Sequence, residues 1–287
     1  MTEPRPPKAV RRDEAKAAAQ RLREEQQRAA RRQRTLAAGL LVAGIAVVGV
    51  IVAVILNQGG GDAAGAEEQP SVSSDRGAIV LDADGIVQPP DEQVTPGEDG
   101  EDGNDDDVVW PQGAFDDAVV VSVYSDYMCP FCGLFEESNG PLLEELRASG
   151  EIVLAMHPVA ILDRYSAGTQ FSTRATAAVF AVAEQAPEAL IEFNALLFAN
   201  QPEENSTGLS DEQIADLASQ AGVPDDVVAT LADGTYTWWA AQATDRASQD
   251  LGSLSTPTIL LDGVPLAEGV DWRVEGALAE AIDAARG

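Results

Sequence analysis

The two cysteines are the side chains best suited to chemistry, and they lie close together in the chain. Cys129 and Cys132 are the only cysteines among 287 residues. The apolar stretch 119–124 before them is typical of a buried strand, and residues 134–146 after them have helical character. Because a helix N-terminus carries unpaired N–H groups and a partial positive charge, it favours a thiolate on Cys129. A lowered pKa would make that sulfur a nucleophile and a good leaving group in disulfide exchange.

Two other uses of a cysteine pair fit this chain less well. A structural disulfide across so short a loop would constrain the unfolded chain very little. A zinc site would need two more ligands, and the sequence has one histidine and no second cysteine pair. The pair is therefore interpreted as redox-active, and neither a metal nor another cofactor is expected.

The surrounding pattern predicts a mixed α/β domain. A second strand is expected at 151–156, and residues 258–266 have the pattern of a hairpin through Asp262-Gly263. Apolar residues at helical spacing occupy much of the interval from about 163 to 250. A final helix is predicted from a cap at Asp271 to about residue 285. This order is that of the thioredoxin-like fold with an inserted helical subdomain, in which a Cys-x-x-Cys is a redox motif.

An uncharged apolar run at residues 36–56 precedes this domain. At about 1.5 Å per residue, about 21 residues span about 30 Å, which is the thickness of a bilayer core. A cleaved signal peptide is the alternative, but its apolar region would be shorter, about 7–15 residues, and would end at a small-residue cleavage site. The run is therefore predicted to be a single transmembrane helix that stays attached as an anchor.

The charges on the two sides of this run predict its orientation. Residues 1–35 hold eleven Lys and Arg against five Asp and Glu, whereas the remaining chain holds seven basic and 43 acidic residues. The positive-inside rule then places the N-terminus in the cytoplasm and exports the residues after 56. An exported domain meets an oxidising compartment, where a dithiol catalyst has substrates. The overall net charge of −30 argues against nucleic-acid binding.

Composition divides the chain into four segments. They are a basic cytoplasmic helical segment (1–35), the transmembrane helix (36–56), a flexible linker (57–75) and the folded domain (76–287). Residues 78–87 suggest a small hairpin with a turn near Asp84-Gly85. Residues 88–107 read as an acidic loop. Because this loop lacks the spacing of an EF-hand, a solvated loop is favoured over a calcium site.

Two motifs carry a resemblance to a known family. Residues 124–132, Tyr-Ser-Asp-Tyr-Met-Cys-Pro-Phe-Cys, and the downstream Ser255-Thr256-Pro257-Thr258 resemble the DsbA-like thiol–disulfide oxidoreductases. The similarity is greatest to membrane-anchored forms of high-GC Gram-positive bacteria, and it covers about residues 76–287. It implies that Cys129 is the attacking sulfur and Cys132 the buried resolving one. It also implies a cis Pro257 that faces the disulfide and leaves the Thr256 backbone free to pair with a substrate strand.

The chain departs from the family pattern at two positions, one between the cysteines and one six residues before Cys129. Pro130 and Phe131 separate the two sulfurs and are expected to tune their potential. Phe131 stands where many relatives have histidine, so the disulfide is expected to be a weaker oxidant than that of the strongest family members. Val123 stands where many relatives bury a carboxylate.

The missing carboxylate leaves the proton acceptor for Cys132 open between water and Asp126, which is expected on the adjacent loop. His157 is a further candidate for a proton relay because it follows a strand and could approach the site. A satisfied structural histidine is nevertheless the favoured reading of His157.

The resemblance implies a membrane-tethered, extracytoplasmic enzyme that forms disulfides in exported proteins. Reduced exported proteins would be its substrates, and a quinone-linked membrane partner would reoxidise Cys129 and Cys132. A disulfide reductase or isomerase is the alternative within redox chemistry. A non-catalytic tethered module that binds peptides or acts as a holdase is the alternative from another class.

Overall fold

The structure, a computed structural model, describes residues 67–89, 115 and 118–287. The predicted segments 1–35 and 36–56 lie outside the described residues, as does most of the acidic loop 88–107. Within the described part of the chain, no helix is both long enough and apolar enough to cross a bilayer.

A six-stranded mixed sheet forms the centre of the domain, in the order β2-β1-β4-β3-β5-β6. Its strands are β1 (Ile79–Asp82), β2 (Gly85–Ile86), β3 (Val119–Ser125), β4 (Ile152–Pro158), β5 (Thr258–Leu261) and β6 (Val264–Pro265). The central pair β3 and β4 is parallel, and β1 and β5 pair antiparallel on either side of it. All seven residues of β4 are buried, as expected for a strand covered on both faces.

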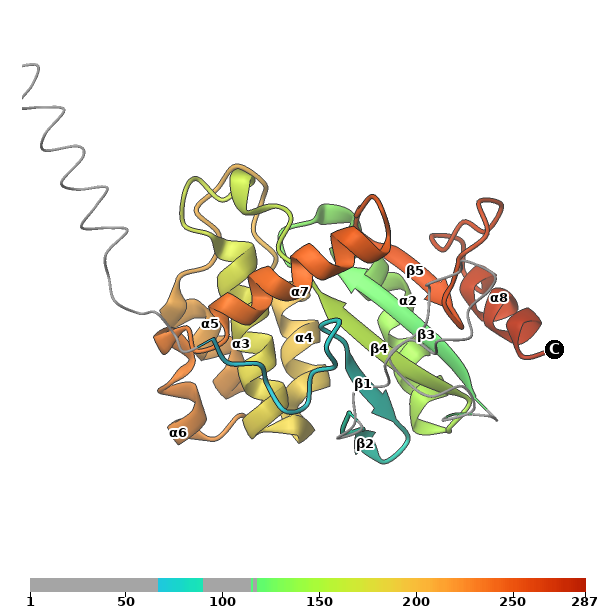
Figure 1. Ribbon diagram of the computed structural model, residues 1–287, viewed down its shortest axis with the longest axis horizontal. Helices are drawn as coiled ribbons and strands as arrows, with labels where there is room; N and C mark the ends of the chain where they lie inside the picture. Colours follow the sequence, from blue (N-terminus) through green and yellow to red (C-terminus); the bar gives the residue numbers. More distant parts are fainter. Residues whose placement is uncertain (1–66, 90–114, 116–117) are drawn as a thin grey trace, which may run out of the picture. The chain divides into compact units, whose positions relative to one another are not determined.

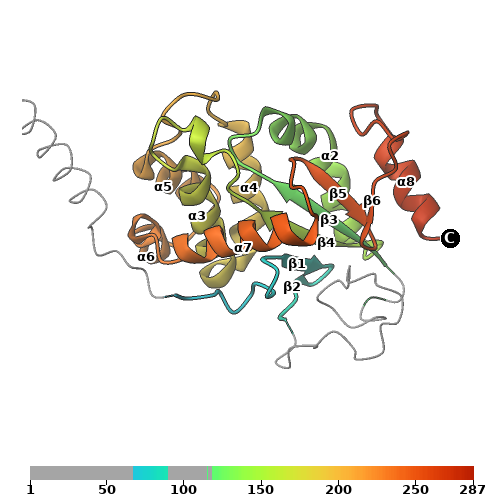
Figure 2. The same ribbon diagram turned by 45° about the horizontal axis from the view of Figure 1, so that its top comes forward.

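One helix follows β3 directly, and five helices form the insertion between β4 and β5. They are α2 (Pro130–Ala148), then α3 (Phe171–Gln185), α4 (Leu190–Ala199), α5 (Asp211–Gln220), α6 (Asp225–Val228) and α7 (Thr237–Asp250), with short turns η1 (Asp163–Tyr165), η2 (Pro187–Ala189) and η3 (Leu231–Asp233). The last helix is α8 (Ala277–Ala285). Figures 1 and 2 show α3 to α6 grouped beside one end of the sheet, with α7 and α2 on its opposite faces.

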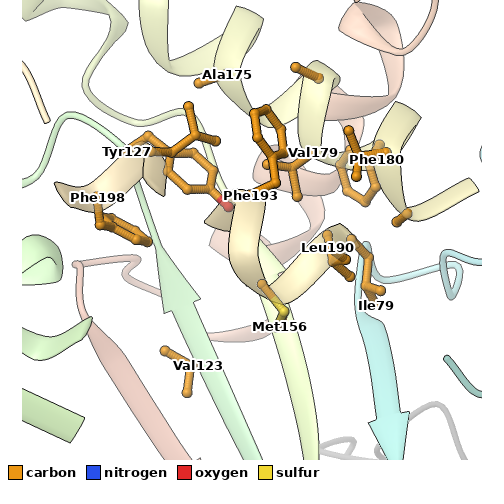
Figure 3. Close-up of a cluster of buried hydrophobic side chains, with 14 of the residues drawn as sticks. Ile79, Val123, Tyr127, Met156, Ala175, Val179, Phe180, Leu190, Phe193 and Phe198 are labelled. Carbon is orange, nitrogen blue, oxygen red and sulfur yellow. The ribbon is translucent and has the colours of Figure 1, made fainter. Parts of the chain in front are cut away.

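The main core lies where α3 and α4 meet the sheet and the start of α2. Tyr127, Phe193 and Phe198 meet there beside Val179 of α3, as Figure 3 shows. Eleven of the fifteen residues of α3 are buried, so this helix is the centre of the insertion. The insertion is therefore packed onto the segment that carries the cysteines.

Most elements lie where the sequence predicts them, including the hairpins at 79–86 and 258–265 and the helical insertion. The final helix is an exception, because it begins at Ala277 and not at Asp271. Asp271 accepts hydrogen bonds from the backbone N–H and the guanidinium of Arg273, which makes a local turn instead of a helix cap. Gly276, with φ of 83°, is the residue that precedes the helix.

The folded domain begins earlier than the predicted boundary at residue 76. Val72, Ser73 and Ser74 are buried, and Ser73 Oγ accepts a hydrogen bond from Trp239 Nε1 at 3.0 Å. The Trp239 ring is fully buried. A buried indole N–H needs a partner, and the end of the predicted linker 57–75 supplies one. These residues therefore belong to the domain.

Candidate active site

The two cysteines lie where β3 gives way to α2. Cys129 is the N-cap residue of α2, and Pro130 is its first helical residue. Proline suits this position because an N–H there would have no partner within the helix. Both cysteines are free thiols, and their residues are only 5% and 1% exposed for Cys129 and Cys132 respectively.

The surroundings of Cys129 favour its thiolate. A hydrogen bond from the Cys132 thiol is the largest cause that lowers the pKa of Cys129, to about 6. Bonds from the Thr256 side chain and from the backbone N–H groups of Cys132 and Phe131 act in the same direction, against the effect of burial. The expected influence of the helix N-terminus is thus present as two specific N–H donors.

Cys132 has the opposite character. Burial raises the pKa of its thiol far above the ordinary value, and the neighbouring charge of Cys129 raises it further. Cys132 therefore stays protonated, and its thiol donates a hydrogen bond to Cys129. The motif therefore combines an acidic thiol, Cys129 at the N-terminus of α2, with a buried thiol, Cys132 one turn into the helix.

The downstream segment with Thr256 and Pro257 lies against Cys129, as predicted. Cys129 Sγ lies 3.3 Å from the carbonyl oxygen of Thr256, to which its protonated thiol donates a hydrogen bond. The peptide bond between Thr256 and Pro257 is cis, as the resemblance implies. Residues that are 127 positions apart in the chain are thereby brought to one site.

Asp126 follows β3 as predicted, but its carboxylate is buried and does not face solvent. It is 0% exposed, and it accepts hydrogen bonds from Met128 N at 2.8 Å, Ser172 Oγ at 2.7 Å and Leu162 N at 2.9 Å. Burial raises its pKa to about 6, the three hydrogen bonds oppose that rise, and the charge of Cys129 adds to it. Asp126 therefore titrates near neutral pH beside the reactive sulfur.

His157 has structural partners on the face of the sheet that α7 covers. Its ring stacks on Tyr124, with 4.0 Å between centroids, and it bonds to the backbone of Arg76. Burial lowers its pKa to about 3, and the nearby Arg76 charge contributes. The reading as a satisfied histidine is correct only in part, because Nδ1 is buried and has no hydrogen-bond partner among the residues that the structure describes.

Val123, at the position where relatives bury a carboxylate, faces a cavity of about 40 Å³. Glu136 lines the same cavity, and burial raises its pKa to about 7. Its Oε1 accepts a hydrogen bond at 3.0 Å from Asn194, which in turn accepts one from the Tyr127 hydroxyl at 2.8 Å. Sequence reasoning missed Glu136, although its helical spacing of four residues from Cys132 was a usable signal.

A second missed residue is Gln201, just beyond α4. Its Nε2 donates hydrogen bonds to the carbonyl oxygens of Tyr127 at 3.0 Å and Cys129 at 2.9 Å. No local pattern points to it, because 72 residues separate it from Cys129.

The outer side of the site is apolar. Phe131 is 57% exposed and Leu134 is 39% exposed, both on the first turns of α2. Phe131 thus gives its backbone N–H to Cys129 while its ring remains accessible to another molecule.

Comparison with known proteins assigns the domain. The sequence model of the thioredoxin family matches residues 105–283. The oxidised form of DsbA from Mycobacterium tuberculosis is 27% identical, with a TM-score of 0.53 over 73% of this chain and 93% of that chain. The reduced disulfide oxidoreductase DsbG from the same species is also 27% identical, with a TM-score of 0.53 over 75% and 95% of the two chains. MdbA from Corynebacterium diphtheriae, at 23% identity and a TM-score of 0.52 over 77% and 99%, shares the fold.

A partial match among curated proteins is of a different kind. A stretch of 139 residues is 27% identical to part of the serine/threonine-protein kinase PknE from Mycobacterium tuberculosis. This match covers 47% of the present chain but only 25% of the kinase, so it carries no kinase activity over. The family match and the two structures at 27% identity decide the assignment: the chain belongs to the thioredoxin family, and its described domain is of the DsbA-like thiol–disulfide oxidoreductase type.

Proposed function

We propose that this protein is a membrane-tethered, extracytoplasmic enzyme that introduces disulfides into exported proteins. The observation that carries the proposal is the contrast between an acidic Cys129 and a buried, protonated Cys132. A stabilised Cys129 thiolate favours the reduced pair over the disulfide, so the disulfide tends to pass to a substrate. A less stabilised Cys129 thiolate would favour the disulfide form of the pair, and with it a reductase.

The first step is attack by a substrate thiolate on Cys129 Sγ of the oxidised pair. A bond forms between the substrate sulfur and Cys129, the Cys129–Cys132 bond breaks, and its electron pair goes to Cys132. Because Cys132 is buried, its thiolate takes up a proton. Asp126 is the proposed source, since its carboxyl titrates near neutral pH and interacts with the charge on Cys129. His157 is left out of this relay because its stacking partner Tyr124 lies on the sheet face that α7 covers.

The second step is attack by another thiolate of the substrate on its own sulfur in the mixed disulfide. The substrate gains a disulfide, and Cys129 leaves as a thiolate with the electron pair. Its pKa of about 6 makes it a good leaving group at neutral pH. The enzyme now holds two electrons as a dithiol, and a quinone-linked membrane partner is proposed to accept them.

Substrate binding is proposed at the two surfaces that flank Cys129. An extended substrate segment would pair with the backbone at Thr256, which gives affinity with little sequence specificity. The accessible rings and methyl groups of Phe131 and Leu134 would bind apolar residues, which unfolded proteins expose.

The exchange assay uses the full chain in detergent micelles. Oxidised wild-type protein is expected to restore activity to reduced, unfolded ribonuclease, and Cys129→Ser is expected to abolish this. Cys132→Ser should accumulate mixed disulfides on non-reducing gels, because the resolving thiol is missing. Adducts with Cys129→Ser in place of Cys132→Ser would reverse the two roles.

The same assay separates the alternatives. Reduction of insulin without oxidation of ribonuclease would favour a reductase, and repair of scrambled ribonuclease alone would favour an isomerase. Binding of unfolded protein with neither activity would favour a holdase.

The tether is proposed from the apolar run 36–56 and from the net charge of +6 on residues 1–35. Protease added to spheroplasts should cut the acidic segment 88–107 and leave residues 1–35 protected. Digestion of the basic segment with protection of the C-terminal domain would show the inverted orientation. In that case glutathione and thioredoxin would hold the cysteines reduced, and the oxidase proposal would fail.

A further inference from the structure

The amide of Gln201 holds the turn that carries Cys129. Its Nε2 reaches two carbonyl oxygens, those of Tyr127 and Cys129, at 3.0 and 2.9 Å. The orientation of this amide follows from its partners, because two carbonyl oxygens can be satisfied only by the nitrogen end. The Cys129 carbonyl also accepts the first helical bonds, from Cys132 N at 2.9 Å and Gly133 N at 3.2 Å. Gln201 therefore joins the turn before α2 to the first turn of the helix.

Gly133 leaves the space that this amide occupies. A Cβ atom built on Gly133 would lie 2.5 Å from Gln201 Oε1, closer than van der Waals contact allows. The φ angle of Gly133 is not positive, so its backbone does not require glycine. Alanine is a better helix former than glycine in the interior of a helix. The observed reason for glycine here is the close approach of Gln201.

The thiolate of Cys129 depends on donors whose direction this turn sets. The backbone N–H groups of Phe131 and Cys132 lower the pKa of Cys129, and the Cys132 N–H also donates to the Cys129 carbonyl oxygen at 2.9 Å. These N–H groups belong to the same first turn of α2 whose carbonyl Gln201 holds. A loose turn would let the two donors spread over several directions, and hydrogen bonds weaken steeply as their angles open.

We propose that Gln201 is a positioning residue for the exchange reaction. By holding the turn that carries Cys129, it keeps the N–H groups of Phe131 and Cys132 directed at Cys129 Sγ. It acts through the backbone of the turn that carries Cys129 and need not touch the substrate. The inference rests on the proposed function for its meaning, but not for its test, since the charge state of Cys129 is measurable without any substrate. It also gives the helical insertion a role, because Gln201 stands at the end of α4.

The test is the titration of the Cys129 thiolate in the reduced full-length protein, followed by absorbance at 240 nm. Cys132 does not interfere, because burial raises its pKa far above that of Cys129. Gln201→Ala is expected to raise the Cys129 pKa by about 0.5 to 1 unit, as the loss of a net hydrogen bond or two would do. The equilibrium constant for reduction of the disulfide by glutathione should fall by about 3- to 5-fold, because the reduced form loses its stabilised thiolate.

Two further variants distinguish positioning from packing. Gln201→Glu keeps the size of the side chain but turns a carboxylate towards two carbonyl oxygens, so it should raise the pKa at least as much as Gln201→Ala. Gly133→Ala keeps the Gln201 amide but displaces it. This variant should therefore also raise the Cys129 pKa, although alanine improves the helix propensity of α2. The double variant Gly133→Ala/Gln201→Ala should show no larger shift than Gln201→Ala alone, since both changes remove one interaction.

Asn200→Ala is the matched control. Asn200 is the neighbouring residue, and its side chain donates to the Leu196 carbonyl oxygen of α4 at 2.9 Å and not to the turn that carries Cys129. Its loss should leave the Cys129 pKa unchanged. The two titratable groups that interact with Cys129, Asp126 and Cys132, are intact in every variant.

Unchanged Cys129 pKa values and glutathione equilibria in folded Gln201→Ala and Gln201→Glu proteins would overturn the inference. If Gln201→Ala does not fold, the Gly133→Ala protein decides, and an unchanged pKa there has the same meaning. A shifted pKa in a protein whose wild type exchanges no disulfides would support the positioning role and reject the proposed function.

Discussion

Cys129 Sγ and the carbonyl oxygen of Thr256 lie 3.3 Å apart, although 127 residues separate them in the chain. The sheet makes this contact, because β5 pairs antiparallel with β3 and brings Thr258 opposite Tyr124. Cys129 follows β3, and Thr256 precedes β5. The helical insertion therefore lies between the two halves of the site in sequence without separating them in space.

Replacing Phe131 by histidine should make the disulfide more oxidising. The Phe131 backbone already donates to Cys129 Sγ, and its side chain is 57% exposed, so an imidazole fits there beside the thiolate. A shift of about 30 mV, equivalent to about 1.4 kcal/mol, is expected in glutathione buffers. Phe131→Leu is the control and should leave the potential unchanged. No shift for histidine, or a more reducing value, would show that position 131 does not tune the site.

The sequence predicts those parts of the site that have local patterns. The strand before Cys129 and the helix after Cys132 follow from apolar spacing, and the position of Thr256 follows from its short motif before a strand. The bonds of Gln201 and the burial of Asp126 have no such pattern. They depend on how the insertion packs against the redox turn, and the partner residues are far away in the chain.

The two boundary errors have the same physical origin. Residues 72–74 have the composition of a linker, but the buried Trp239 indole needs an acceptor and Ser73 provides it. Asp271 has the pattern of a helix cap, but bonds to Arg273 hold it in a turn. In both places one specific contact decides against the general composition.

His157 should make the protein sensitive to acid. Its pKa is about 3 in the folded state, below the ordinary 6.5, so the unfolded chain takes up the proton first. The stability from neutral His157 is complete above pH 6.5 and is lost as the pH falls towards 3. Between pH 7 and 4.5, wild type should lose about 2 to 3 kcal/mol more than His157→Phe in urea unfolding.

Asp126 acts in the opposite direction. Its raised pKa means that the folded state takes up the proton first. The stabilising contribution of Asp126 therefore grows as the pH falls from about 6 towards 3.8, the pKa of this group in the unfolded chain. This effect is the same in wild type and His157→Phe and cancels in the comparison. Parallel pH profiles of the two proteins would show that His157 is not the buried neutral residue described above.

Removal of residues 67–75 should destabilise the domain. A chain that begins at residue 76 loses the buried Val72 and leaves the Trp239 N–H without Ser73. The free energy of unfolding should fall by about 2 to 4 kcal/mol relative to a chain that begins at residue 67. Ser71→Ala in the longer chain is the control, because Ser71 is exposed and its hydrogen bond to Glu184 is exposed as well, so its loss should matter little. Equal stability of the two chains would return these residues to the linker.

The reduction potential of the Cys129–Cys132 pair tests the central claim most directly. It is measured on the full chain at pH 7 by equilibration with glutathione buffers and trapping of the free thiols. The pair has a stabilised Cys129 thiolate but no histidine beside it. For an enzyme that forms disulfides, its reduction potential should therefore be between about −200 and −120 mV, where −120 mV is the value of the strongest oxidants of this type. A value near −270 mV, like that of thioredoxin, would contradict the account and identify the pair as a reductant.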